Sequence, residues 1–228
     1  MITKPPVIAI DGPSGVGKGT LCKELSKKLQ WYALNSGIIY RALAIAALHN
    51  QVDISAEEAL IPLVSHLINL NFTPHEKEIK VILAGKDISM KIHDQQVSDV
   101  ASRVALFPRL RQKMLSVQHS FRVFPGLVAE GRDMGTIVFP DACVKIFLDA
   151  NAKARTHRRM LQLQDNGVSV NFNQLLSQIE ERDERDLHRS ISPLITTDDA
   201  LIIDSTNMSI QKVIEIALHY TRIQLAKA

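Results

Sequence analysis

The chain has 228 residues, 46% of them hydrophobic, and 27 Lys and Arg against 24 Asp and Glu give a formal charge of +3. This length suits one α/β domain with small insertions, and the hydrophobic content is ample for a full core. The charge and the aromatic content of 5% are too low to indicate nucleic-acid binding.

The sequence also predicts a soluble cytoplasmic protein. Residues 1–6 lack the long apolar core of a signal peptide. No window reaches the roughly 18 uncharged apolar residues that a membrane span needs, and the richest one, 38–48, is interrupted by Arg41. Cys22 and Cys143 have no metal-ligand spacing, which is typical of a reducing compartment. We therefore expect a cytoplasmic monomer that binds neither membranes nor nucleic acid.

The first elements in the chain are a strand, a glycine-rich loop and a helix. The apolar run 7–10 predicts a buried strand, and a helix is expected over 18–29. Between them, glycines let successive backbone N–H groups turn toward one point, and the helix adds the positive end of its dipole. The spacing of Gly12, Gly17 and Lys18 matches a nucleotide-binding loop. The nucleoside triphosphate is expected on Gly12, Pro13, Ser14, Gly15, Val16, Gly17, Lys18, Gly19 and Thr20.

The loop departs from the common pattern directly after the lysine. The usual motif has Ser or Thr there as a magnesium ligand, but this chain has Gly19, and the hydroxyl comes one residue later at Thr20. Magnesium usually keeps several waters and binds through substrate phosphates. A Mg²⁺ ion held by phosphates and water is therefore consistent with this loop.

Alternating strands and helices predict a parallel sheet in the rest of the chain. Four further strands are expected at 31–35, 126–130, 144–149 and 201–204, and helices at 38–49, 56–68, 96–104, 108–121, 152–163, 172–188 and 210–226. Ser55 and Glu58 predict a capping box for the helix over 56–68. Short strands at 70–72, 78–83 and 86–89 predict a small antiparallel insert.

The turn at 131–136 is the second candidate for a functional segment. It follows a buried strand, and in a parallel sheet it emerges at the same edge as the glycine loop. Arg132 and Asp133 are thus expected near the phosphate site. The alternative is a structural Arg–Asp pair within the turn.

The helix over 172–188 carries a dense run of charges. Such runs are usually solvated faces with i,i+4 pairs. However, the apolar stripe of Leu175 and Ile179 continues at helical spacing through Arg182, Asp186 and Arg189. Charges on a core-facing stripe must be paired or line a cleft, and two arginines beside a carboxylate suit a phosphate and a sugar hydroxyl.

Two further groups are candidates. Arg155, Arg158 and Arg159 lie at i, i+3 and i+4 on one helix, where they suit either nucleotide phosphates or a solvated basic face. Ser36, Tyr40 and Arg41 open the helix after the second strand, and the arginine interrupts an otherwise apolar start.

With these motifs in place, the chain resembles bacterial cytidylate kinases, a branch of the nucleoside monophosphate kinases, over nearly its whole length. The motifs that carry the resemblance are 12–20, 36–41, 107–111, 131–136 and the helix with Arg182, Asp186 and Arg189. The resemblance implies one P-loop kinase domain over 1–228, with a five-stranded parallel sheet flanked by helices. It also implies a monophosphate-binding insertion with the small β sheet at about 36–105, and a short helical lid at about 152–168.

The resemblance also implies transfer of the γ-phosphoryl group of ATP to CMP or dCMP, with Mg²⁺. Lys18, Arg132, Asp133, Arg182 and Arg189 would be catalytic, and Arg155, Arg158 and Arg159 would belong to the lid on ATP. The cytosine edge falls to Ser36, Arg111 and Asp133, the sugar to Ser102, Arg182 and Asp186, and the acceptor phosphate to Arg41, Arg132 and Arg189, with Tyr40 beside them. Asn35 departs from the Asp expected in most relatives.

Two other functions fit some of these features. A P-loop kinase for another small acceptor, such as a different nucleotide or shikimate, shares the loop and the arginines. A nucleotide-dependent switch or nucleic-acid-binding ATPase shares the loop but needs partner surfaces that the sequence does not indicate.

Overall fold

The computed structural model describes residues 4–69, 71–72, 81–83, 85–165 and 167–227. The chain divides into two compact units, one made of Met1–Leu34 with Arg122–Ala228 and the other of Asn35–Phe121. The insertion expected at 36–105 falls within the second unit, which also includes the helix that follows it. No helix of the described residues has the length and apolar character needed to cross a membrane.

A five-stranded sheet organises the first unit. Its strands lie in the order β2-β6-β1-β7-β8, which confirms the predicted parallel arrangement. The strands are β1 (Val7–Asp11), β2 (Tyr32–Asn35), β6 (Leu127–Glu130), β7 (Val144–Asp149) and β8 (Leu201–Asp204). The central strand β1 is buried along its whole length, which explains its unbroken apolar run.

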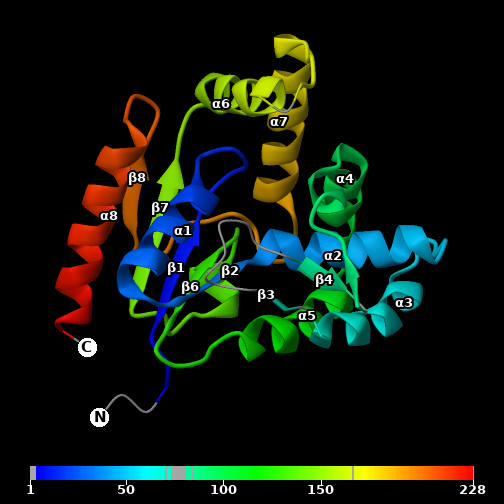
Figure 1. Cartoon of the computed structure of the whole chain (residues 1–228), viewed down its shortest axis with the longest axis horizontal. Coiled ribbons are helices and arrows are strands. Elements are labelled where there is room, and N and C mark those ends of the chain that lie inside the picture. The colour runs from blue at the N-terminus through cyan, green and yellow to red at the C-terminus, as the bar shows by residue number, and fades with distance from the viewer. Residues whose placement is uncertain (1–3, 70, 73–80, 84, 166, 228) are drawn as a thin grey trace. The chain divides into compact units, whose positions relative to one another are not determined.

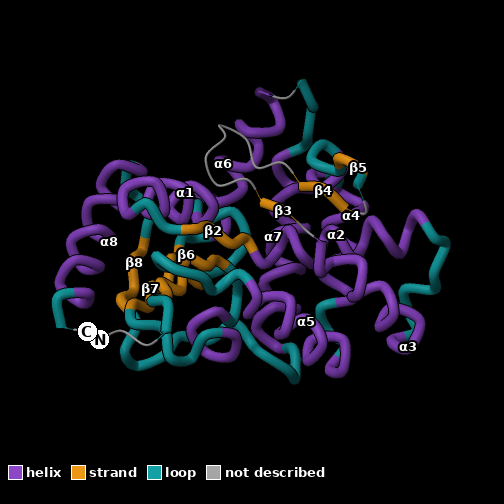
Figure 2. Tube along the Cα trace, turned by 60° about the horizontal axis from the view of Figure 1, so that its bottom comes forward, coloured by secondary structure: helices purple, strands orange, loops and turns teal. Residues whose placement is uncertain are grey.

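Helices α1 (Lys18–Leu29) and α8 (Ile210–Leu225) pack on one face of this sheet. Leu21 and Leu25 of α1 and Val213 of α8 share one core cluster with Ile8 and Ile10 of β1. Figure 2 shows the two helices along the same side of the strands. Helices α6 (Ala152–Asp165) and α7 (Phe172–His188) lie beyond the carboxyl ends of the strands in Figure 1.

The second unit is mainly helical and carries the small sheet. Its α-helices are α2 (Ser36–His49), α3 (Glu57–Leu60), α4 (Gln95–Val104) and α5 (Pro108–Ser120), with 3₁₀ helices at Ile61–Asn69 and Lys91–His93. Strands β3 (Asn71–Phe72), β4 (Val81–Leu83) and β5 (Lys86–Asp87) pair antiparallel, as predicted. Residues 70 and 78–80 of the predicted strands lie outside the described residues.

The capping box predicted at Ser55 and Glu58 was wrong. The backbone N–H and hydroxyl of Ser55 donate instead to the carboxylate of Asp53, and α3 begins without a side-chain cap. Glu58 pairs with Arg109. The predicted continuous helix over 56–68 becomes a 3₁₀ helix from Ile61, because Pro62 has no N–H to continue the α-helical ladder.

Candidate functional site

The glycine loop connects β1 to α1 with backbone angles that require glycine. The φ angles of Gly12, Gly15 and Gly17 are 146°, 80° and 101°. A Cβ atom on Gly12 would lie 2.0 Å from the carbonyl oxygen of Leu148 on the neighbouring strand β7. Any side chain there would force the strand and the loop apart. The loop thus brings its backbone N–H groups to the carboxyl edge of the sheet, at the start of α1.

Lys18 is buried at the base of this loop, with only 6% of its surface exposed. Its Nζ donates to the carbonyl oxygens of Gly12, at 2.8 Å, and Pro13, at 2.7 Å. Burial, and then the charge of Arg132, hold the pKa of Lys18 well below its usual value, against the opposing effect of Glu130. An anion placed here would restore the charged ammonium form, since opposite charge stabilises a desolvated cation.

Glu130 lies close to residue 19 of the loop. It is the last residue of β6 and is buried, and a Cβ atom on Gly19 would lie 3.2 Å from its Oε1. The carboxylate thus occupies the space beside the position where the common motif carries a hydroxyl. The sequence predicted the strand but did not identify Glu130 as a site residue. The described residues include no group of three or more His, Cys, Asp or Glu side chains able to hold a metal ion by themselves.

The turn after β6 faces helix α7. Arg132 Nε donates to Asp186 Oδ2 at 2.7 Å, and both side chains are largely buried. Burial acts to raise the pKa of Asp186, but the charges of Arg132, Arg182 and Arg189 outweigh it and hold that pKa below its usual value. The structure therefore brings these four predicted residues into one electrostatic cluster that favours the ionised form of the carboxylate.

The pattern of buried residues along α7 agrees with the helical spacing in the sequence. Asp186 is buried on the same helix as Leu175 and Ile179, whereas Glu181 and Glu184 are exposed. Beyond the helix, the guanidinium of Arg189 donates to the carbonyl oxygen of Ser192. Asp133, the other acid predicted for the site, is buried in the turn after β6.

The arginines of α6 contact the glycine loop. Arg155 donates to the carbonyl oxygens of Ala150 (2.8 Å) and Ser14 (3.1 Å) and makes a two-point pair with Asp183 of α7. Arg158 donates to the carbonyl oxygen of Val16 at 3.3 Å and to Ser205. Both guanidinium groups thus donate to protein oxygens, and these two arginines do not form a solvated basic face. No local pattern in the sequence indicated the pairing of Arg155 with Asp183.

A cavity of about 350 Å³ opens beside the loop and α6. This volume lies in the range of ligand pockets, and its walls combine apolar and polar groups as such pockets do. Arg159, half-buried here with its pKa lowered by burial, contributes to the wall. The lining residues are Gly15, Val16, Gly17, Thr20, Arg158, Arg159, Gln162, Ser205, Met208, Ile210 and Val213. Sequence reasoning missed those from Gln162 onward, because their approach to the loop depends on the tertiary fold.

The remaining predicted residues lie in the second unit. Ser36 begins α2, and the side chain of Asn35 accepts a hydrogen bond from Ile38 N at 3.2 Å, so Asn35 caps this helix. The guanidinium of Arg111 lies 5.7 Å from the ring centroid of Tyr40, within cation–π range.

The other two predicted residues of this unit lie on α2 and α4. Arg41 Nη2 donates to Ser98 Oγ at 3.3 Å. Ser102 lies on α4 one turn beyond Ser98 and is half-buried. The basic and hydroxyl groups expected to bind an acceptor thus come from three helices of this unit, α2, α4 and α5.

Comparison with known proteins decides the family. The family model for cytidylate kinase matches residues 8–223. The chain belongs to the cytidylate kinase family. It is 61% identical over 226 residues to a cytidylate kinase of Erwinia tasmaniensis, covering 99% of both chains. It is 58% identical to one of Salmonella typhimurium, covering 98% of both.

Solved structures add a likeness of fold. A gluconokinase from Sinorhizobium meliloti aligns with a TM-score of 0.50 at 11% identity, covering 97% of this chain and 95% of that one. Members of the cytidylate kinase family are phosphotransferases. This chain has the sheet order of its fold, together with a glycine loop and an arginine cluster that suit phosphate groups.

Proposed function

We propose that the enzyme transfers the γ-phosphoryl group of ATP to CMP or dCMP, giving ADP and CDP or dCDP. The observation that carries this proposal is the arginine cluster around Asp186, at the same sheet edge as the loop that buries Lys18. Both reactants are polyanions, and this edge offers cationic groups to each. Membership of the cytidylate kinase family supports cytidine nucleotides as the acceptors.

On the donor side, residues 12–20 would bind the ATP phosphates through backbone N–H groups and Lys18. The cavity of about 350 Å³ has the size and lining for the base and sugar of the donor. Glu130 would hold Mg²⁺ through water, with the remaining ligands from phosphates. The metal would neutralise charge on the phosphate oxygens.

On the acceptor side, we assign the phosphate to Arg41, Arg132 and Arg189, the sugar to Ser102, Arg182 and Asp186, and the cytosine edge to Ser36, Arg111 and Asp133, with Tyr40 supporting Arg111. A carboxylate whose pKa is held low can accept hydrogen bonds from sugar hydroxyls throughout the physiological range. The buried Asp133 can accept from the exocyclic amine of cytosine, which uracil lacks.

The reaction needs neither a covalent intermediate nor a strong base. Phosphoryl transfer depends mainly on alignment of the two nucleotides and on stabilising charge over the transferred oxygens. Lys18 and the arginines would supply that charge. Arg155 and Arg158, through their contacts with the loop carbonyls, would hold α6 against the donor site and help to exclude water.

A coupled assay with ATP, Mg²⁺ and each nucleoside monophosphate tests the proposal. CMP and dCMP should be used at least about 100-fold more efficiently than UMP or AMP, a selectivity within reach of a site that hydrogen-bonds a polar group. Asp133→Asn should reduce this preference while the protein stays folded. Rapid use of shikimate or another acceptor, or ATP hydrolysis without an acceptor, would overturn the proposal.

We also propose that the enzyme is cytoplasmic and monomeric. Sedimentation at the assay concentration would check the monomeric state.

A further inference from the structure

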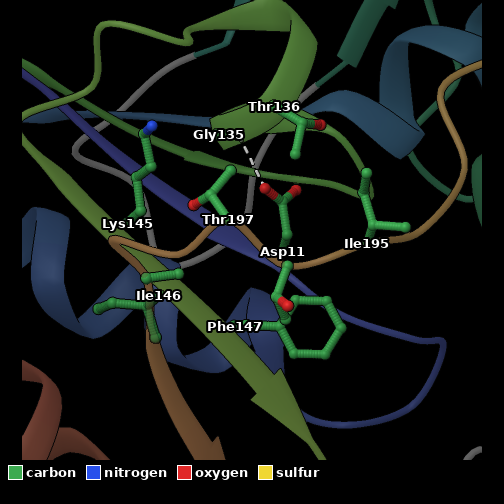
Figure 3. Close-up of a pocket in the computed structure, with 10 residues that line it drawn as sticks. Asp11, Gly135, Thr136, Lys145, Ile146, Phe147, Ile195 and Thr197 are labelled. Atoms are coloured by element: carbon green, nitrogen blue, oxygen red, sulfur yellow. Dashed lines mark hydrogen bonds between the residues drawn. The ribbon is translucent and has the colours of Figure 1, made fainter.

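Asp11 ends the central strand β1 directly before the glycine loop, and no role in binding has been assigned to it above. Only 6% of its surface is exposed. Its Oδ1 accepts the backbone N–H of Met134 at 2.8 Å, and its Oδ2 accepts the backbone N–H of Gly135 at 2.8 Å. Both oxygens are therefore committed to the turn that follows Asp133. Figure 3 shows the carboxylate pointing toward Gly135 and Thr136.

That turn has an unusual backbone. Residues Met134–Val138 form a single π-helical turn, in which the N–H groups of Ile137 and Val138 both donate to the carbonyl oxygen of Asp133, at 2.9 and 3.0 Å. Single π-helical turns are rare and are frequently found at functional sites. The first N–H groups of any helical turn have no partner within it, and here Asp11 supplies both acceptors from another element. The carboxylate thus acts as a remote cap.

The surroundings of Asp11 oppose its charge. Burial, helped by the charge of Asp133, raises the pKa of Asp11 to about 6, against the lowering effects of the two backbone hydrogen bonds and of Lys18. A small cavity of about 10 Å³ beside it, room for one water molecule, is also lined by Thr136 and Lys145. Lys145 is paired with Asp199. A buried carboxylate with a raised pKa reduces stability, so its place here is better explained by function.

We propose that Asp11 is a positioning residue that fixes Arg132 and Asp133 relative to the glycine loop. This inference rests on the function proposed above. Its backbone continues directly into Gly12, and its side chain holds the two residues that follow Asp133. One residue thereby sets the distance between the group that reads the acceptor and the loop that binds the donor. The ionised form serves this role best, because both of its oxygens only accept hydrogen bonds, whereas protonation turns one of them into a donor that faces an N–H group.

The variant Asp11→Asn tests this in the full chain. The amide keeps the shape but replaces one acceptor with a donor that faces an N–H group. We expect kcat/KM for CMP to fall about 10- to 100-fold, which is the usual effect of removing a group that orients the residues in contact with a ligand. KM for ATP should stay within about twofold, and the melting temperature should not fall. Glu215→Gln, which changes an exposed carboxylate on α8 in the same way, is the control and should leave all three unchanged.

A measurement on the unchanged protein complements the variant. The amide proton shifts of Met134 and Gly135 should titrate together with a midpoint near the pKa of about 6 of Asp11, and Asp11→Asn should abolish that titration. Unchanged CMP kinetics in the folded variant would overturn the proposal, and so would amide shifts that do not titrate. Should Asp11→Asn fail to fold, Asp11→Glu, which keeps the charge, must retain the paired titration. Absence of CMP phosphorylation in the unchanged protein refutes the proposed function instead, since the amide titration does not depend on it.

Discussion

Arg155 of α6 makes a two-point ion pair with Asp183 of α7, with Nη1 3.0 Å from Oδ1, and the same guanidinium donates to Ser14 of the glycine loop at 3.1 Å. One side chain therefore joins the donor loop to the helix that carries Asp186. Arg155 is only 4% exposed, so its charge depends on these partners for compensation. Two-point pairs of this kind fix orientation as well as distance.

The first prediction concerns this pair. Asp183→Asn removes the charge that compensates buried Arg155, so the free energy of unfolding should fall by about 2–4 kcal/mol. Denaturant unfolding monitored by circular dichroism measures the change. Glu184→Gln is the matched control, because Glu184 is 71% exposed and its removal should cost less than about 0.5 kcal/mol. Equal unfolding midpoints for the two variants would contradict the structural role of Asp183.

Asp183 also shows where the sequence stops being informative. Helical spacing from Leu175 and Ile179 correctly predicted that Asp186 is buried, because burial along one helix follows its period. The same reasoning did not single out Asp183, since its partner comes from α6 and no local pattern encodes that contact. Tertiary partnerships between charged side chains require the fold.

The sheet and the glycine loop were predictable for a different reason. Buried parallel strands are continuous apolar runs, and the loop has a fixed spacing of glycines and lysine. Asp11 was not identified as functional, because an acid ending a strand is common and its two N–H donors lie 123 and 124 residues away. The capping box at Ser55 failed because Asp53 competes for the same groups.

The second prediction tests the acceptor cluster. Arg132→Ala removes a cation that is hydrogen-bonded to Asp186, so kcat/KM for CMP should fall about 100- to 1000-fold, the range for loss of one preorganised charge partner. KM for ATP should change little. Steady-state kinetics with each substrate varied in turn separates the two effects. Arg222→Ala, an exposed arginine on α8, makes the same change of charge and should be neutral. Near-normal turnover of CMP by the folded Arg132 variant would refute the assignment.

The third prediction concerns Glu130 and magnesium. Glu130→Gln should weaken binding of ADP in the presence of Mg²⁺ by about 10-fold, because an amide is a poorer partner for metal-bound water. Binding of ADP without metal should not weaken, since the carboxylate repels phosphates. Calorimetry with and without Mg²⁺ gives both values, and Glu215→Gln, exposed on α8, is the control. An equal loss under both conditions would mean that Glu130 acts through Lys18 or the fold, and not through the metal.

The last prediction is the pH dependence of stability that follows from Asp11. Its pKa is about 6 in the folded protein against an ordinary value of 3.8, so the folded state holds this proton more tightly than the unfolded chain. Stability from this group is therefore complete below pH 3.8 and declines as the pH rises to about 6. The difference of about two pKa units corresponds to up to about 3 kcal/mol. Asp11→Asn abolishes this titration in both states, so the variant should gain stability relative to the unchanged protein between pH 4 and 7. Thermal unfolding of both proteins across this range measures the trend. A variant whose relative stability is constant or falls with pH would show that Asp11 is ionised at little cost, and that its charge stabilises the fold.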